Sequence, residues 1–406
     1  MHRSQTADQE MVRKVNRSLV LNTLRLYAPI SRVEVANLTG LNRSTVSNII
    51  NALIDEGMVW EQERQDSRVG RPSVSLTLRP DGGAVIGVEI GVDFISVLMT
   101  DFVAKPLYQD WIDLPEASPQ IDVLVQAEQS IDQAIALANQ QRLKLLGIGV
   151  GVPGLVNTNR GELIFAPNLK WRDVPLRLMW NQRFHLPIYV ENEANLAALG
   201  EYYFGVARGV DDFVYLSSGI GLGGGMIVNG KLYGGAHGFA GEIGHMQRDP
   251  NGEQCACGRR GCWETQVGPR AVLRRVKNTL RESPDSPRPV GCAADLSNLT
   301  FTMVSHAALN GDPICRQAIE GVAEHLGRGI ADLVNLFNPD LVVIGGALSL
   351  GKEILLPVIE KTVFDQSLGP SSNSTRIAFS ERGKDACVYG AVAVVLDDIL
   401  REMVLV

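Results

Sequence analysis

The chain has 406 residues, of which 45% are hydrophobic and 20% are charged. This composition excludes an intrinsically disordered protein and leaves enough apolar surface for two or three domains. Residues 1–80 carry 11 Lys and Arg against 8 Asp and Glu, whereas the remainder carries 27 against 37. A mildly basic head therefore precedes an acidic body, an asymmetry that points to nucleic-acid contact and that motifs must support.

The N-terminus lacks the apolar segment of a signal peptide, and no run of about eighteen uncharged apolar residues occurs in the chain. The cysteines show no spacing typical of a disulfide framework. We therefore expect a cytoplasmic protein with no membrane partner, associated with the nucleoid if it binds DNA.

The first helix is predicted over 15–28, where apolar residues recur with helical spacing. Ser31 and Glu34 have the spacing of a capping box at the start of a second, short helix. Asn42 begins a third helix with one apolar stripe. This order is that of a helix-turn-helix, whose second helix enters the major groove. The polar face of the third helix is predicted to contact DNA through Arg43, Ser44, Ser47, Asn48 and Asn51.

A β wing is predicted next, from two strands at 59–64 and 73–78. Arg68 and Arg71 lie at its tip, where they would follow phosphates or enter a narrow minor groove. A turn-rich segment then ends a winged helix-turn-helix domain at residues 1–80. The alternative is a three-helix packing domain that does not bind nucleic acid.

Strands and helices alternate from residue 84 onward, which predicts an α/β architecture. Several of the strands end in glycine, as at 151–154 and 345–346, and the hairpin at 213–235 is rich in glycine. Missing β-carbons allow a ligand to approach the backbone closely, so these strand ends are predicted to face a ligand.

One histidine and three cysteines lie within eighteen residues, in the order His245, Cys255, Cys257 and Cys262. Zinc takes four nitrogen or sulfur ligands in a tetrahedron, and a closed Cys3His shell leaves no position for a reactive water. The sequence therefore predicts a structural Zn²⁺ site. The alternative, three reduced cysteines in an ordinary loop, does not explain the glycines between them.

The segment from Gly241 to Glu264 resembles the zinc and sugar signature of the ROK family of repressors, open reading frames and sugar kinases. The motifs VENEAN at 190–195 and GVPG at 151–154 are also similar to that family. The N-terminal domain resembles its repressor branch, of the xylose- and glucose-repressor type. The resemblance implies an actin-like ATPase fold of two α/β lobes, and a homodimer or tetramer.

The expected domains are a first lobe at 81–195, joined by a C-terminal helix at 385–406, and a second lobe at 196–384. The second lobe would hold the zinc knuckle and the oligomerisation surface. The resemblance further implies a set of sugar-binding residues: Gly154, Asn192, Glu193, Glu242, His245 and Glu264. If one nitrogen of His245 binds zinc, the other can donate to a sugar hydroxyl.

The resemblance implies that the sugar kinases of the family begin with a phosphate loop of the type Asp-x-Gly-Gly-Thr. This chain departs from that pattern. Glu89 begins the corresponding segment, and Val92 and Asp93 replace a glycine and a hydroxyl. Phosphate cradles rely on backbone N–H groups and positive potential, which these residues oppose. Glu193 also stands where the family has a catalytic Asp. We therefore interpret the protein as a sensor without enzymatic activity.

The predicted function is that of a sugar-responsive DNA-binding regulator that represses genes for carbohydrate uptake or catabolism. A dimer would place two winged helices on a palindromic operator, and an aldose of the xylose or glucose class would alter their spacing. Two alternatives stay open. One is an ATP-dependent sugar kinase with a DNA-binding head, and the other is a repressor controlled by a protein partner.

Overall fold

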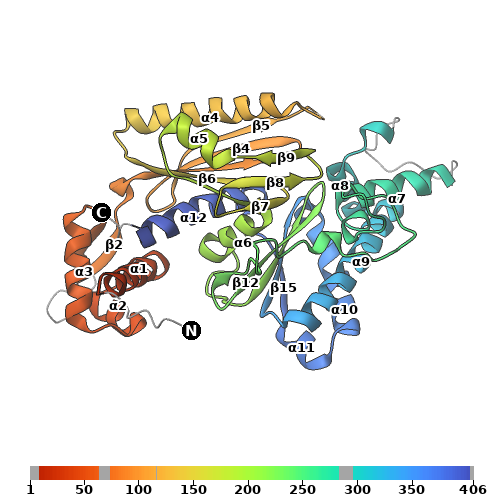
Figure 1. Cartoon of the computed structure of the whole chain (residues 1–406). Coiled ribbons are helices and arrows are strands. Elements are labelled where there is room, and N and C mark those ends of the chain that lie inside the picture. The colour runs from red at the N-terminus through yellow and green to blue at the C-terminus, as the bar shows by residue number, and fades with distance from the viewer. Residues whose placement is uncertain (1–8, 64–73, 116, 283–295, 403–406) are drawn as a thin grey trace, which may run out of the picture.

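The computed structural model describes residues 9–63, 74–115, 117–282 and 296–402 (Figure 1). A small helical head at the N-terminus is followed by two lobes, each built on a five-stranded sheet. This is the expected winged helix-turn-helix followed by a two-lobed α/β fold.

The head begins where the capping signals place its helices. The Ser31 hydroxyl accepts from the Glu34 amide, and the Glu34 side chain accepts from the Ser31 amide, so the capping box is complete. Asn42 caps the third helix by accepting from the Thr45 amide. The wing strands run antiparallel, with Val59 opposite Leu78. The elements are α1 (Gln9–Tyr27), α2 (Arg32–Thr39), α3 (Arg43–Asp55), β1 (Val59–Glu63) and β2 (Val74–Leu78).

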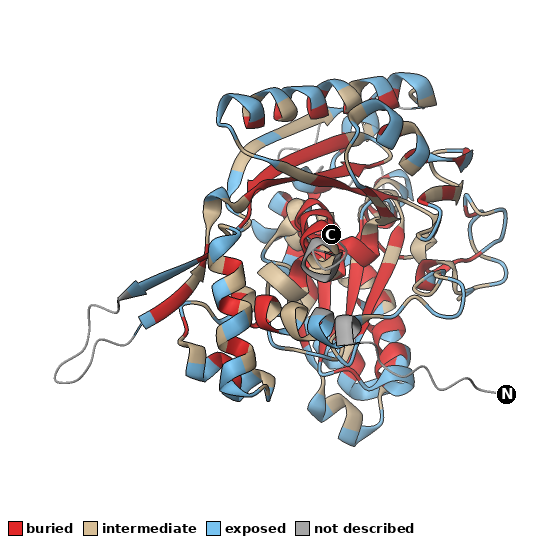
Figure 2. Cartoon of the chain, turned by 60° about the vertical axis from the view of Figure 1, so that its left-hand side comes forward, coloured by how far each residue is buried: buried red, intermediate tan, exposed pale blue. Residues whose placement is uncertain are grey.

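The core of the head continues into the body. Leu24 of α1 and Ile50 of α3 belong to the same buried cluster as Val392 and Leu396 of the last helix, α12 (Ala386–Glu402). Figure 2 shows buried residues concentrated in the central strands and the helices between them, while outer helix faces are exposed. The head is therefore packed on the body through a shared apolar core.

The first lobe has the strand order β10-β6-β3-β4-β5. Every residue of its central strand β3 is buried, as expected for a strand that is covered on both faces. Helix α4 packs on β3 and β4, and α12 packs on β3 and β6. The elements are β3 (Ala84–Ile90), β4 (Phe94–Asp101), β5 (Pro106–Asp113), α4 (Gln120–Gln140), β6 (Leu145–Val152), α5 (Leu176–Phe184) and β10 (Ile188–Asn192). A smaller sheet beside it contains β7 (Leu155–Asn157), β8 (Glu162–Ala166) and β9 (Trp171–Val174).

The second lobe has the order β13-β12-β11-β14-β15. Along β11, Phe213 and Tyr215 pack with α6, whereas Val214 and Leu216 face the cluster that contains α9. The period of two places helices on both faces of this sheet. The strands are β11 (Phe213–Ser218), β12 (Leu222–Val228), β13 (Lys231–Leu232), β14 (Leu341–Gly346) and β15 (Arg376–Phe379). The helices are α6 (Glu193–Phe204), α7 (Pro269–Glu282), α8 (Phe301–Leu309), α9 (Pro313–Phe337), α10 (Lys352–Gln366) and α11 (Gly369–Ser374).

Helices α6 and α12 pack against each other between the two sheets. A β-carbon on Gly390 of α12 would overlap the Leu196 carbonyl oxygen, and one on Gly200 of α6 would overlap the Ala386 carbonyl oxygen. The two helix backbones are therefore in direct contact. Among the described residues, no helix is long and apolar enough to cross a membrane.

Candidate functional site

A cavity of about 1010 Å³ lies between the lobes, where strand ends of both sheets meet. It is lined by the turn after β3, by Gly154 and the start of α6 from the first lobe side, and by β11, β12 and the metal loop from the second. The structure brings all six predicted sugar residues to this pocket, namely Gly154, Asn192, Glu193, Glu242, His245 and Glu264.

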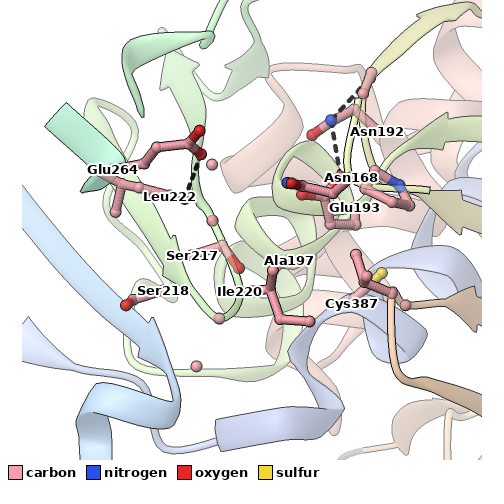
Figure 3. A pocket seen from close by; sticks show the side chains of 18 of the residues that line it. Asn168, Asn192, Glu193, Ala197, Ser217, Ser218, Ile220, Leu222, Glu264 and Cys387 are labelled. Atoms are coloured by element: carbon pink, nitrogen blue, oxygen red, sulfur yellow. Dashed lines mark hydrogen bonds between the residues drawn. The ribbon is translucent and has the colours of Figure 1, made fainter. Parts of the chain in front are cut away.

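Two parts of the pocket differ in chemistry. We call the part around Glu242, His245 and Glu264 the metal end, and the part around Glu89 and Phe94 the turn end. Glu89 contacts Cys387, and Figure 3 shows Cys387 and Glu264 on opposite sides of the pocket. The Glu193 carboxyl lies near residues of both ends, because the carboxyls of Glu242 and Glu89 both raise its pKa.

Asn192 is held rigidly at the start of α6. Its Oδ1 atom accepts from the Ala194 and Asn195 amides, at 2.8 and 3.2 Å. Its Nδ2 atom donates to the Gly154 carbonyl at 3.1 Å and to Glu193 Oε2 at 2.8 Å (Figure 3). All four hydrogen-bonding positions of the amide are thus used by the protein. In this structure Asn192 fixes the backbone and Glu193, rather than presenting a free amide to the pocket.

Two carboxyl groups with raised pKa values line the pocket, the buried Glu89 and the half-buried Glu193. Desolvation, together with smaller contributions from the nearby carboxyls of Glu242 and Glu89, raises the pKa of Glu193 to about 8. Burial also raises the pKa of Glu89 to about 8. Glu89 Oε2 has no hydrogen-bond partner in the part of the chain that the structure describes. Both groups are therefore mostly protonated at neutral pH, and each can donate a hydrogen bond.

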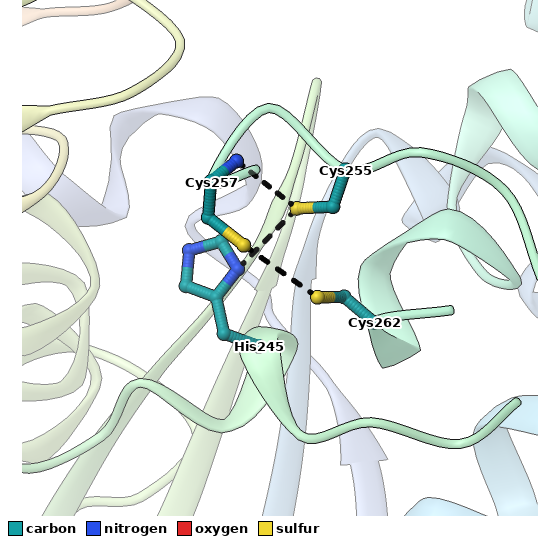
Figure 4. Close-up of side chains that lie close together, drawn as sticks. All are labelled: His245, Cys255, Cys257 and Cys262. Atoms are coloured by element: carbon teal, nitrogen blue, oxygen red, sulfur yellow. Dashed lines mark hydrogen bonds between the residues drawn. The ribbon is translucent and has the colours of Figure 1, made fainter. Parts of the chain in front are cut away.

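The predicted metal ligands form one cluster (Figure 4). The ligand atoms of His245, Cys255, Cys257 and Cys262 all lie within 4.8 Å of one another. Cys255 Sγ lies 3.6 Å from His245 Nδ1, and Cys257 Sγ lies 3.7 Å from Cys262 Sγ. A tetrahedron with metal–sulfur bonds of about 2.3 Å has edges of about 3.7 Å. The donor set and its spacing therefore fit a four-coordinate zinc ion.

The loop reaches this geometry through glycine. Gly261 has a φ of 64°, and a β-carbon there would overlap the Asp249 carbonyl oxygen. The Gly261 carbonyl accepts from the Arg248 amide at 2.7 Å, which brings the two arms of the loop together. Only glycine allows this close approach, and it places Cys262 beside the other ligands.

His245 joins the metal cluster to the pocket. Its Nδ1 atom faces Cys255, whereas its Nε2 atom lies 3.8 Å from Glu242 Oε2. Glu264 Oε1 lies 2.7 Å from Cys255 Sγ, and Glu264 Oε2 accepts from the Leu222 amide at 3.4 Å. This geometry fits the expected roles of the two ring nitrogens, because Nδ1 faces the metal cluster and Nε2 faces the pocket. Glu264 bridges the metal loop to β12, a contact that spacing does not indicate.

Several residues that line the pocket are not indicated by any sequence motif. Asn168, in the turn between β8 and β9, lies beside Gly221 together with the Glu264 carboxylate. At the turn end, the Phe94 ring stacks on Trp111 with centroids 4.2 Å apart and planes 8° apart. Lys384 Nζ lies 4.0 Å from the centre of the Trp111 ring. The sequence indicates Asn168 only as a polar residue just after a strand. No sequence pattern indicates that Phe94 stacks on Trp111.

The phosphate-loop residues line the turn end. Glu89 is buried, Val92 is half-buried and Asp93 is exposed. The Phe94 ring lies against Gly91, so that a β-carbon there would overlap it. Aromatic and acidic groups therefore occupy the position expected for a phosphate cradle.

The predicted reading face of α3 is accessible. The side chains of Arg43, Asn48 and Asn51 are exposed, and that of Ser47 is half-buried. Ser44 is also exposed, and its hydroxyl donates to Asn42 Oδ1 at 2.8 Å. The two wing arginines, Arg68 and Arg71, lie outside the described residues.

Comparison with known proteins supports the family that the sequence motifs indicate. The model of the ROK family matches residues 85–398, and the model of a winged helix-turn-helix DNA-binding domain matches residues 16–59. The chain belongs to the ROK family. The expected resemblance is thereby confirmed, with the helix-turn-helix that marks its transcriptional regulators.

Similar proteins include ROK regulators and a ROK kinase. The xylose repressor of Caldicellulosiruptor bescii is 37% identical over 96% of this chain and 97% of its own length. A ROK family transcriptional regulator, described as a homolog of E. coli MLC protein, has a TM-score of 0.83 with 29% identity, covering 97% of this chain and 98% of its own. A ROK glucokinase from Streptomyces griseus, solved with glucose and AMPPNP, has a TM-score of 0.68 with 32% identity, covering 77% of this chain and 99% of its own.

Proposed function

We propose that this protein is a repressor of carbohydrate genes that binds operator DNA through α3 and whose DNA affinity is set by an aldose, with D-xylose as the first candidate. The observation that carries the proposal is that one chain combines a pocket lined by several carboxyl groups beside a metal cluster with a DNA-binding head that shares a core with the body. The likeness to a xylose repressor over nearly the whole chain supports the choice of sugar.

The metal end suits a sugar with vicinal hydroxyls. Glu242 and Glu264 offer acceptors on either side of His245, and charge-assisted hydrogen bonds are about twice as strong as neutral ones. His245, Cys255, Cys257 and Cys262 would hold a structural zinc ion. In that arrangement the metal loop fixes the orientation of His245, and the protein presents its Nε2 atom to the ligand.

The turn end argues against phosphoryl transfer. Asp93 is exposed and acidic, and the aromatic ring of Phe94 packs against Gly91, whereas a phosphate cradle relies on backbone N–H donors and positive potential. Glu193 stands where kinases of the family have an Asp, so its carboxyl is one methylene farther from the backbone, and a displacement of a catalytic group by about 1 Å can cost about 100-fold in rate. We therefore propose a sensor rather than an enzyme, and the sugar kinase is the second candidate because of the likeness to the glucokinase.

Binding to DNA would use a pair of these chains. A helix-turn-helix dimer reads two half-sites separated by about one helical turn, so a change in the relative position of two heads changes affinity. We propose a homodimer or tetramer on a palindromic operator in the cytoplasm.

A thermal-shift screen of the full chain tests the proposal, with D-xylose, D-glucose and D-ribose measured with and without ATP and Mg²⁺. A ligand at 100 times its Kd stabilises a protein by about 2.7 kcal/mol. We expect stabilisation by xylose without ATP and no sugar-dependent release of ADP. ADP formation would replace the sensor by the kinase. The absence of a shift with every aldose would favour a repressor controlled by a protein partner.

A further inference from the structure

One arginine of the DNA-binding head is enclosed by the body. The side chain of Arg25, near the end of α1, is only 7% exposed. Its guanidinium carbon lies 3.6 Å from the centre of the Tyr203 ring of α6. The nearest carboxylate contact is Asp397 Oδ1 of α12, at 3.9 Å from Nη2. The body also holds the next residue of α1, because Arg208 Nη2 donates to the Leu26 carbonyl at 3.1 Å.

The guanidinium is not satisfied by hydrogen bonds. None of its three nitrogens has a hydrogen-bond partner in the described part of the chain, although all three are buried. A buried charge without hydrogen bonds is costly, and a bidentate contact with a carboxylate would lower its energy. The distance to Asp397 is about 1 Å longer than such a contact requires. A small movement of α12 therefore changes how strongly the body holds Arg25.

Helix α6 connects this contact to the pocket. It begins at Glu193 in the pocket, with Asn192 as its cap, and Tyr203 is ten residues later. At 1.5 Å per residue the two points are about 15 Å apart. The helix is buried along most of its length, and at its end the Phe204 carbonyl accepts from Arg382 at 2.8 Å. It is therefore placed to move as one rigid body.

Helix α12 makes the same connection in parallel. It begins beside the pocket, where Cys387 lines the turn end. Farther along, Asp397 reaches Arg25 and also accepts from the Tyr203 hydroxyl at 3.3 Å. The contacts at Gly200 and Gly390 bring the backbones of α6 and α12 together. Both helices thus start at the pocket and meet the head at the same arginine.

We propose that Arg25, held between Tyr203 and Asp397, is the relay through which ligand binding in the pocket sets the orientation of the DNA-binding head. The relay rests on the proposed function. Closure of the lobes around a sugar shifts the start of α6, and the α6–α12 pair carries that shift to the guanidinium. Because packed interfaces switch between discrete arrangements, a shift of less than 1 Å at the pocket changes the head position.

The test compares the sugar response of DNA binding in variants of the full chain. The probe is a duplex selected from a random pool by the wild-type protein, and Kd is measured with and without saturating D-xylose. We expect xylose to change the wild-type Kd by at least about fivefold, the lower range for coupled sites. In Arg25→Met, which keeps the apolar stem, the change should fall below about twofold, while the Kd for xylose in the absence of DNA stays near that of the wild type.

Two further variants make the result specific. Asp397→Asn is nearly isosteric and should also weaken the response, so it decides the matter if Arg25→Met does not fold. Arg17→Met is the matched control, because Arg17 lies on the same helix but donates to Glu56 within the head. It should keep the full response.

The outcomes are distinguishable. A full response in Arg25→Met or Asp397→Asn overturns the relay and leaves the proposed function intact. Loss of the response in Arg17→Met as well also overturns it, because the effect would then come from a weakened head. No response to any aldose in the wild type overturns the proposed function and the relay together.

Discussion

The metal end and the turn end of one pocket show opposite treatments of polar groups. At the metal end, Glu264 and His245 are held by neighbouring loop atoms and face the cavity. At the turn end, Glu89 is buried with an oxygen atom that lacks a described partner, and an aromatic stack lies beside it. In the proposed function, the metal end binds the sugar, and the turn end is occupied by a buried carboxyl group and stacked aromatic rings.

This difference indicates how a kinase-like fold can serve as a sensor. A binding site needs groups that are already held in place, whereas phosphoryl transfer also needs donors and positive charge at the phosphates. Lys384, a cation at the turn end, lies over the Trp111 ring. In the proposed function, the turn end therefore contributes packing, and the metal end contributes recognition.

The largest effect is expected from breaking the metal cluster. Cys257→Ser should lose zinc and weaken xylose binding by about 100-fold, because metal binding and folding of the loop are coupled and the metal positions His245. Metal analysis and calorimetric titration measure the two quantities. Cys315→Ala, in the core of the second lobe, is the control and should keep both. Xylose binding that survives loss of the metal would show that the metal end does not depend on zinc.

Asn192 allows the cap of α6 to be separated from the pocket. Asn192→Ala should lower the free energy of unfolding by about 1 kcal/mol, the usual value of an N-cap, and weaken xylose binding. Asn192→Asp keeps a good cap but loses the donors to Gly154 and Glu193. It should keep the contribution of the cap to stability and still bind xylose weakly, as measured by chemical denaturation and titration. Equal xylose affinity in Asn192→Asp and the wild type would contradict a positioning role for the amide.

At the turn end, Phe94→Ala should affect stability more than sugar binding. The ring stacks on Trp111, and such pairs contribute about 1 kcal/mol beyond buried area. We expect a lower melting temperature and a xylose Kd within about twofold of the wild type, because separated sites act nearly independently. A large loss of xylose affinity would mean that the sugar extends to the turn end.

A further effect at the turn end is a change in pH dependence. The raised pKa of Glu89 means that the folded protein binds a proton which the unfolded chain has released, between about pH 4.5 and pH 8. This group therefore lowers stability as the pH rises through that window. Glu89→Gln should remove that part of the dependence of the unfolding free energy on pH. Compared with the wild type, the variant should gain stability between pH 5 and pH 8, as measured by chemical denaturation at both values. The exposed Glu360→Gln is the control and should leave the slope unchanged. An unchanged slope in Glu89→Gln would place its pKa near that of an ordinary carboxyl.

The sequence reveals the features that depend on neighbours along the chain. The capping box at Ser31, the Asn42 cap and the spacing of the metal ligands are local, and the structure contains all three. The wing strands were predicted within one residue of their observed bounds. Local hydrogen bonds and close ligand spacing are the signals that a single sequence carries well.

Contacts between segments that are distant along the chain could not be predicted from the sequence. The stacking of Phe94 on Trp111 requires the pairing of β4 with β5, and the enclosure of Arg25 requires α1, α6 and α12 to meet. The inward hydrogen bonds of Asn192 also differ from its expected use, because its motif indicates a polar group but not the atoms that it contacts. Side-chain direction depends on tertiary packing, which no spacing rule encodes.

The apolar core shared by α1, α3 and α12 has a practical consequence for protein engineering. Exchanging the first 80 residues with those of another family member would place a foreign surface against the last helix. A chimaera designed to respond to this ligand at a different operator should therefore also take the residues of α12 that share the core of the head, such as Val392 and Leu396, from the donor of the head. The fit between head and body is thus set by α12 as well as by α1 and α3.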